Sequence, residues 1–274
     1  MSNAETAQLC AEIRKTLIET VGKTGGHLSS NLGIVELTVA IHKTFNAPAD
    51  KIIFDVGHQS YVHKILTGRY EKMPELRKKG GISGFTRRSE SEYDPFGSGH
   101  SGNAVSAGLG FAEANRMDDK NDYVVCVVGD GSFTNGMVFE ALNNCHRENL
   151  NLIIILNDNE MSISPNVGGL AKYLSKKSSS KKYFRFKKGL QRFLKHIPYL
   201  GNGLIALFRK IRDLLKRIIF PGNIFEDLGL DYIGPVDTFD VSKICDVLEE
   251  AKSQKKVCLV HVLTHKGRGY APSE

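Results

Sequence analysis

Two uninterrupted apolar segments, each ending at a short polar turn, constrain the fold of this 274-residue chain most strongly. Residues 123–128 (YVVCVV) lead into Gly129-Asp130-Gly131, and residues 152–156 (LIIIL) lead into Asn157-Asp158-Asn159. From Asn135 onward, apolar residues recur at helical spacing. The order predicts strand, turn, helix and strand, with both strands buried on both faces of a parallel sheet.

The two polar turns carry side chains that suit a divalent cation. Asp130 offers a carboxylate between two glycines, and Asn159 offers an amide oxygen 29 positions later. Carboxyl ends of parallel strands meet at one edge of a sheet, where ligands bind. Oxygen ligands completed by phosphate and water suit Mg²⁺, and the start of the following helix favours an anion. The pair therefore predicts a magnesium site, although Gly-Asp-Gly alone would equally suit a hairpin turn.

Three histidines follow strand ends or glycine-rich turns. His27 comes directly after Gly-Gly and before a helix, and His58 follows a predicted strand at residues 52–56. His100 lies in a glycine- and serine-rich tract, residues 80–84 and 89–102, that has few core residues. Such loops carry function more often than packing, but each histidine on its own also fits a local structural role.

The remaining pattern predicts an α/β fold with helices on both faces of the sheet. Ser30 or Asn31 is expected to cap a helix. His63 follows His58 by five residues, which places the two on different helix faces, so His63 is interpreted as structural rather than as a zinc ligand. Further helices are predicted at residues 4–21, 104–116 and 240–251, and a strand is predicted at residues 257–263.

Composition limits location and partners. The chain has no run of 18 apolar residues and begins without a signal-peptide pattern, so no membrane span and a cytoplasmic location are expected. Its five cysteines include no Cys-x-x-Cys pair, which indicates reduced, buried thiols.

Positive charge is concentrated in one segment. Residues 171–220 hold 15 Lys and Arg and one acidic residue, Asp213, so the rest of the chain has a net charge of −7 against +7 for the whole. We interpret residues 166–222 as a basic, partly helical, mobile insertion. Basic and aromatic residues together occur in nucleic-acid binding, and the apolar stripe at residues 204–218 occurs in membrane-surface helices. A lid that packs on the domain itself is the third interpretation, and no nucleic acid is expected.

Together, Gly-Asp-Gly and Asn-Asp-Asn at this spacing resemble the thiamine diphosphate fingerprint of the transketolase superfamily. Longer segments resemble the N-terminal domain of the 1-deoxy-D-xylulose-5-phosphate synthase family. These are GGHLSSNLGIVELTVAIH, FDVGHQSYVHKILTGR, SESEYDPFGSGHS, LNDNEMSIS, LGLDYIGPVD and KGRGYAP. They run from about Gly25 to Pro272, and only residues 166–222 look unlike the family pattern. The resemblance implies that this region is a cover over the active site, which favours the lid.

The resemblance implies a thiamine-diphosphate-binding fold and a set of site residues. His27 and His100 are implied to be catalytic. Asp130, Asn159 and the carbonyl of Met161 are implied to hold Mg²⁺. The residues implied to bind the cofactor are His58, Gly99, His100, Ser101, Gly129, Gly131, Ser132, Asn159 and Lys266.

The resemblance also implies what the 274 residues lack. They are expected to form a single domain that supplies the diphosphate half of the cofactor site, without the pyrimidine-binding and C-terminal domains of the synthase. A second chain is expected to supply the pyrimidine half, in a homo- or hetero-oligomer. The complete assembly would join pyruvate to glyceraldehyde 3-phosphate, releasing carbon dioxide and forming 1-deoxy-D-xylulose 5-phosphate. A split transketolase and a non-catalytic cofactor-binding domain are the alternatives.

Overall fold

The computed structural model describes residues 1–146, 149–159, 169, 224–237, 240–254 and 256–273. Met161 and, apart from Gly169, the predicted insertion at residues 166–222 lie outside the described residues. Within them, no helix is long and apolar enough to cross a bilayer. All five cysteines are free thiols, and only Cys245 is not fully buried.

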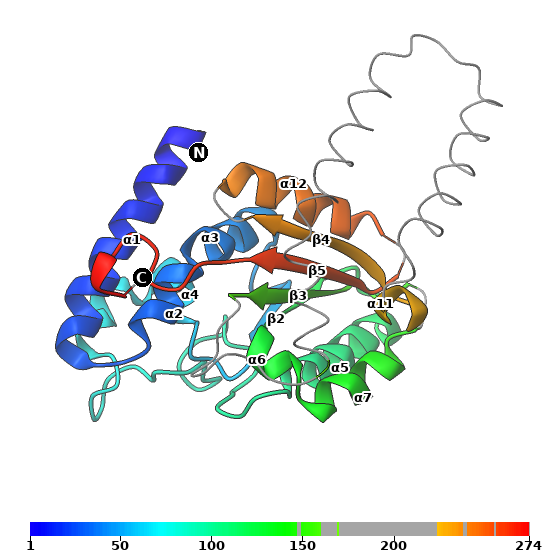
Figure 1. The fold of residues 1–274 in the computed structure, drawn as a ribbon. Coiled ribbons are helices and arrows are strands. Elements are labelled where there is room, and N and C mark those ends of the chain that lie inside the picture. Colours follow the sequence, from blue (N-terminus) through cyan, green and yellow to red (C-terminus); the bar gives the residue numbers. More distant parts are fainter. Residues whose placement is uncertain (147–148, 160–168, 170–223, 238–239, 255, 274) are drawn as a thin grey trace, which may run out of the picture.

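The described residues form a parallel sheet of five strands in the order β1-β2-β3-β5-β4 (Figure 1). This confirms the predicted α/β fold. The arrowheads of β3, β5 and β4 point toward α2 and α4, which lie beyond the carboxyl edge of the sheet (Figure 1). The strands are β1 (Lys51–Phe54), β2 (Val124–Gly129), β3 (Leu152–Asp158), β4 (Asp231–Asp237) and β5 (Cys258–Leu263).

Helices cover both faces of the sheet (Figure 1). One layer comprises α1 (Asn3–Thr24), α2 (Leu28–Gly33), α3 (Val35–Thr44), α4 (Tyr61–Lys64) and α12 (Val241–Lys252). The other comprises α5 (Ala104–Met117), α6 (Asp130–Phe133), α7 (Gly136–Asn144) and α11 (Ile224–Asp227). Short irregular helical segments occupy Ile65–Arg69, Tyr70–Glu75 and Ala271–Ser273.

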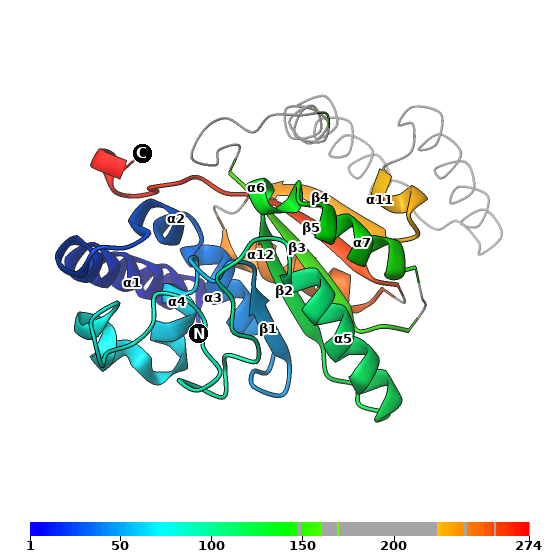
Figure 2. The ribbon, with the colours of Figure 1, turned by 90° about the horizontal axis from the view of Figure 1, so that it is seen from below.

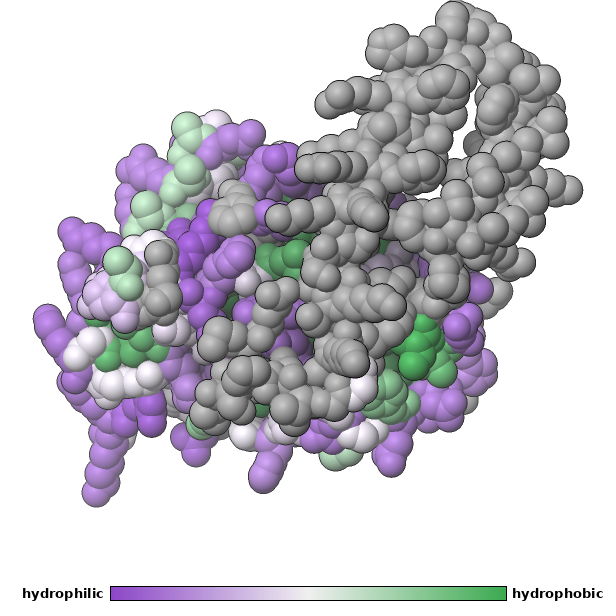
Figure 3. All heavy atoms as spheres, in the orientation of Figure 1, coloured by the Kyte–Doolittle hydropathy of each residue, from purple (hydrophilic) through white to green (hydrophobic). Residues whose placement is uncertain are grey.

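Alternation along the strands divides the core into two layers. In β2, Val125 and Val127 pack with the first layer of helices, whereas Val124, Cys126 and Val128 pack with the second. Every one of these side chains is buried, as expected for a parallel strand covered on both faces. The visible surface around the sheet is mainly hydrophilic, with small separate hydrophobic patches (Figure 3).

Helix α5 packs unusually close to the sheet. A Cβ atom at Gly108 would lie 2.1 Å from Sγ of Cys126, so no larger residue fits there without a backbone shift. The small residues of α5 thus have a direct packing reason.

Two expectations about local structure were wrong or incomplete. Ser30 and Asn31 do not cap a helix, because both lie inside α2. The Asn31 side chain instead donates to the carbonyls of His27 and His58, which joins two turns of the chain. Strand β4 was not predicted, because Gly234-Pro235 interrupts its pattern; Pro is tolerated at the edge of a sheet, where β4 lies.

A buried ion cluster anchors the tract at residues 80–102, which the sequence presented as a loop with few core residues. Asp94 accepts hydrogen bonds from Arg69 at 2.8 and 2.9 Å and contacts Nε2 of His63 at 3.1 Å. Glu90 pairs with Lys64 and Arg69. His63 therefore has the structural environment that its spacing suggested.

Burial alone would raise the pKa of Asp94. Hydrogen bonds from His63, Arg69 and the Arg87 backbone outweigh it and lower the pKa below its ordinary value. The carboxylate is therefore stabilised in the folded protein. Because a lowered folded pKa favours folding above the unfolded value, this contribution is complete above about pH 4 and falls as the pH drops further.

We predict that Asp94→Asn lowers the free energy of unfolding by about 3–5 kcal/mol at pH 7, because it leaves the buried Arg69 without its main partner. The difference in the free energy of unfolding between the variant and the wild type should become smaller below about pH 4, where Asp94 becomes protonated in the unfolded chain. Urea unfolding at a series of pH values measures both effects. Asp118→Asn, at an exposed ion pair with Lys120, is the matched control and should change little. Equal effects of the two substitutions would contradict the anchoring role.

Candidate functional site

The pairing of β2 with β3 brings the two polar turns together. Gly129 at the end of β2 lies opposite Asn157 in β3, so Asp130 and Asn159 follow at neighbouring strand ends. Asp130 is the first residue of α6 and is 4% exposed. Gly131 and Ser132 lie in the same turn of helix. The structure thus places both predicted oxygen ligands at the carboxyl edge of the sheet.

Side chains from other strands fix the second turn. Asn157 donates to Oε1 of Gln59 at 3.0 Å and accepts from Oγ1 of Thr264 at 2.6 Å. Asp158 contacts Nε2 of His261 at 2.8 Å. The sequence analysis did not identify Gln59, Thr264 or His261. Their signal was position: His261 and Thr264 lie in or directly after the strand predicted at residues 257–263, and Gln59 lies three residues after the strand predicted at residues 52–56.

Helices α2 and α4 lie on the same side of the sheet as α1 (Figure 2). His27 directly precedes α2 and His58 comes three residues before α4, and the two histidines meet there. Their ring centroids lie 5.3 Å apart in an edge-on arrangement, and the His27 ring is 6.1 Å from that of Phe85. His27 is exposed, and both its Nδ1 atom and its backbone nitrogen lie 3.5 Å from the Tyr61 hydroxyl. The two predicted histidines therefore form one pair.

Both histidines favour the neutral form. Partial burial and the charge of Arg77 lower the pKa of His27 below its ordinary value. Burial, the neighbouring His27 and the charge of Lys266 lower the pKa of His58 from 6.5 to about 4. At neutral pH each ring thus offers one N–H donor and one acceptor nitrogen.

Two buried polar atoms near His58 have no hydrogen-bond partner among the described residues. They are Nδ1 of His58 and Oγ1 of Thr86. A Cβ atom at Gly57, the neighbour of His58, would lie only 3.2 Å from Thr86 Oγ1, so the two segments are in contact. Because buried polar groups are normally paired, two such atoms at one strand end fit a polar ligand.

The segment after β5 brings Lys266 to the same edge. Gly267 donates to the carbonyl of Ser29 at 2.9 Å. A Cβ atom at Gly33 would lie 2.7 Å from the carbonyl oxygen of His265, so α2 and this segment are in close contact. The positive charge of Lys266 contributes, after burial and His27, to the lowered pKa of His58.

The loop that carries Gly99, His100 and Ser101 is held at the edge but is exposed. Asp55, directly after β1, accepts hydrogen bonds from the backbone of Gly102 and Ala104 at 2.9–3.0 Å. Asn135, the N-cap of α7, donates to the Ser101 carbonyl at 3.3 Å. The loop therefore lies beside the turn of Asp130.

His100 does not join the histidine pair. Its ring has no hydrogen-bond or ring partner among the described residues. Asp55, which fixes its loop, was missed by the sequence analysis; its signal was an acidic residue directly after a predicted strand.

The described part of the chain contains no group of three His, Cys, Asp or Glu side chains that could hold a metal ion. A cation at this edge would therefore depend on Asp130, the amide oxygen of Asn159, and ligands from outside these side chains. Such a donor set, completed by phosphate and water oxygens, suits Mg²⁺ rather than zinc.

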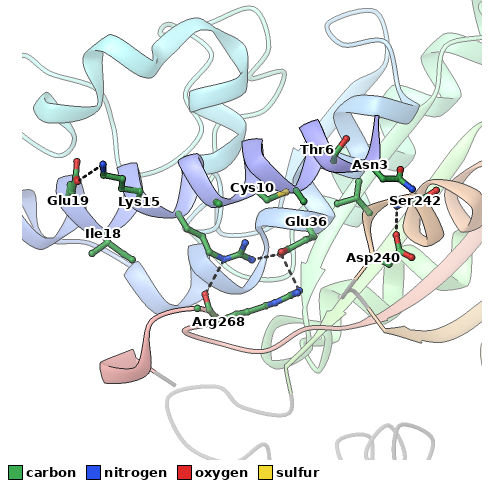
Figure 4. A pocket seen from close by; sticks show the side chains of 15 residues that line it. Asn3, Thr6, Cys10, Lys15, Ile18, Glu19, Glu36, Asp240, Ser242 and Arg268 are labelled. Carbon is green, nitrogen blue, oxygen red and sulfur yellow. Dashed lines mark hydrogen bonds and ion pairs between the residues drawn. The ribbon is translucent and has the colours of Figure 1, made fainter. Parts of the chain in front are cut away.

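A cavity of about 910 Å³ lies beside α1 (Figure 4). It is lined by α1, the start of α3, the start of α12 and the segment at Arg268. Arg14 and Arg268 both reach Oε2 of Glu36, at 2.5 and 3.4 Å, and stabilise its carboxylate. None of the residues predicted to bind the cofactor lines this cavity.

The fold is that of the transketolases. The transketolase of Campylobacter jejuni superposes with a TM-score of 0.71 at 20% identity, covering 98% of this chain and 39% of that protein. The transketolase of Leishmania mexicana gives a TM-score of 0.68 at 17% identity, and the match covers 100% of this chain and 38% of that protein. At these identities the likeness establishes the architecture.

The family follows from sequence. Residues 1–264 match the family described as 1-deoxy-D-xylulose-5-phosphate synthase, and the chain belongs to that family. The synthase of Pelotomaculum thermopropionicum is 51% identical over 97% of this chain and 42% of its own length. The synthase of Syntrophomonas wolfei is 50% identical over 100% of this chain and 43% of its own length. The chain thus spans less than half the length of these relatives.

We predict that His58 remains neutral until the pH approaches 4. Because its folded pKa lies below the unfolded value, protonation favours unfolding, and this histidine makes the protein less stable as the pH falls from 6.5 towards 4. Nitrogen-detected NMR of the imidazole gives the titration midpoint, with His58→Gln identifying the resonance. A midpoint near 6.5 would show that the ring is solvated and that its environment is not the one described.

Proposed function

We propose that this chain supplies the diphosphate- and magnesium-binding half of a 1-deoxy-D-xylulose-5-phosphate synthase. The proposed reaction joins pyruvate to glyceraldehyde 3-phosphate with loss of carbon dioxide. One observation carries the proposal: in a chain of this family, His27, His58, Asp130, Asn159 and Lys266 all belong to the carboxyl edge of one parallel sheet.

The residues at this edge fit thiamine diphosphate with Mg²⁺. Asp130 and Asn159 supply hard oxygen ligands, and the carbonyl of Met161 is proposed as a third. Lys266 supplies positive charge beside the diphosphate, and the turn of Gly129, Gly131 and Ser132 lets that group approach the backbone. The unpaired Nδ1 of His58 and Oγ1 of Thr86 give polar contacts that a bound ligand would complete.

When bound, thiamine diphosphate supplies an electron sink for the carbon that loses carbon dioxide. The chain's own residues orient the substrates and manage protons. A neutral His27, exposed at the edge and beside the Tyr61 hydroxyl, has one nitrogen to donate and one to accept a proton. His100, on the loop fixed by Asp55, is proposed to reach the reacting groups from the other side, together with Gly99 and Ser101.

The pyrimidine half of the site is proposed to come from protein outside these 274 residues, on a second chain. The relatives are more than twice as long as the part that this chain matches, which supports a further contribution to the complete enzyme. Shared binding of this kind requires an oligomer in which the two parts meet at the carboxyl edge of the sheet.

We predict that Asp130→Ala abolishes magnesium-dependent binding of thiamine diphosphate while the fold is retained, because it removes the charged metal ligand. Isothermal titration calorimetry measures the affinity, and circular dichroism measures the fold. Met161→Leu is the matched control and should bind like the wild type, since only its backbone carbonyl is proposed to act. Unchanged affinity of Asp130→Ala would remove this residue from the site.

We also predict that the 274-residue chain alone releases no carbon dioxide from pyruvate in the presence of thiamine diphosphate, Mg²⁺ and glyceraldehyde 3-phosphate. Activity should appear when a chain spanning the remaining length of a relative is added. The measurement is release of labelled carbon dioxide, with His27→Ala in the mixed sample as the control for the site. Turnover by the chain alone would contradict the two-part arrangement.

A further inference from the structure

Three polar side chains form a hydrogen-bonded chain across three neighbouring strands, behind the turn that ends β3. Oδ2 of Asp158 lies 2.8 Å from Nε2 of His261 in β5. Nδ1 of His261 lies 2.8 Å from the hydroxyl of Tyr232 in β4. His261 is completely buried, Asp158 is 4% exposed and Tyr232 is half-buried.

Both ring nitrogens of His261 have a partner. A carboxylate oxygen accepts, so Nε2 of His261 donates to Asp158. Nδ1 of His261 is paired with the Tyr232 hydroxyl. The Tyr232 ring stacks on Phe225 with centroids 5.9 Å apart, which holds the hydroxyl in place. The ring of His261 is thus fixed from both sides.

This polar chain has a cost that ordinary packing would avoid. β5 reads Cys-Leu-Val-His-Val-Leu, and His261 is the one polar side chain among these buried apolar positions. A buried imidazole costs free energy unless both nitrogens are paired, and an apolar residue would fill the same space without that cost. The partner that requires it is Asp158.

Asp158 lies between Asn157 and the proposed metal ligand Asn159. Successive side chains of a strand point to opposite faces, so Asn157 and Asp158 fix the turn from two sides. Gln59 and Thr264 hold Asn157, and His261 holds Asp158. The backbone of Asp158 also accepts from Thr264 N at 2.8 Å, so the position of residue 159 is determined by its neighbours.

We infer that His261 and Tyr232 are positioning residues for the metal site: through Asp158 they set the turn that presents Asn159. The inference rests on the proposed function for the identity of the site. Groups that orient metal ligands typically change metal affinity by about 10–100-fold when they are removed. A purely structural role would change stability without a selective effect on the metal.

The test uses the full 274-residue chain with thiamine diphosphate and Mn²⁺, whose free concentration is measured by electron paramagnetic resonance. Tyr232→Phe removes one hydroxyl and keeps the stacked ring. His261→Leu removes both hydrogen bonds, and His261→Gln keeps a donor near Asp158. We expect Tyr232→Phe and His261→Leu to weaken Mn²⁺ binding about tenfold or more. His261→Gln should restore part of the loss.

Tyr123→Phe is the matched control. Tyr123 is also half-buried and its hydroxyl makes one hydrogen bond, to the carbonyl of Lys252 at 2.9 Å, but it precedes β2 at the opposite edge of the sheet. It should lower the melting temperature about as much as Tyr232→Phe and leave Mn²⁺ affinity unchanged.

Asp130→Ala distinguishes a failure of the positioning role from a failure of the proposed metal site. If it abolishes Mn²⁺ binding while Tyr232→Phe and His261→Leu bind like Tyr123→Phe, the positioning role is overturned and the proposed metal site stands. If Asp130→Ala binds Mn²⁺ like the wild type, or the wild type itself does not bind, the proposed metal site fails and the positioning role fails with it.

Discussion

The register between β2 and β3 is the constraint on which the rest of this structure depends. Gly129 pairs with Asn157, so the chain leaves both strands at the same level and their polar turns face one region. A shift of one residue would turn each buried side chain to the opposite face of the sheet, where the helices of the other layer pack. Both strands are buried on both faces, and the register is therefore strongly specified.

The carboxyl edge is polar because tertiary contacts pair nearly every buried group there. Asp55 binds the backbone that leads into α5, Asn31 joins the turns of His27 and His58, and Thr264 binds Asn157. Each contact connects segments that are far apart in the sequence. The exceptions, Nδ1 of His58 and Oγ1 of Thr86, lie where the family's ligand is proposed to bind.

Much of the fold was predictable because the strong signals were local. The four strands β1, β2, β3 and β5 are mainly apolar, and the predicted helices at α1, α5, α7 and α12 have clear periodicity or small residues. The edge strand β4 was not predicted, because Gly234-Pro235 interrupts its apolar pattern. Its place beside β5 depends on pairing with a segment that is distant in the sequence. The loop at residues 80–102 was misjudged for the same reason: Asp94 is a core residue only because Arg69 and His63 are there.

The sequence by itself determined the chemistry at the strand ends: a carboxylate at Asp130, an amide at Asn159, and histidines at positions 27, 58 and 100. These follow from residue type and from the ends of local elements. Only the tertiary structure decided which of them meet. It pairs His27 with His58, leaves His100 exposed on its loop, and recruits Gln59, His261 and Tyr232, none of which had been given a role from the sequence. The reason is physical: burial and hydrogen bonding between distant segments depend on how strands are ordered in a sheet, and strand order is not encoded in any single segment.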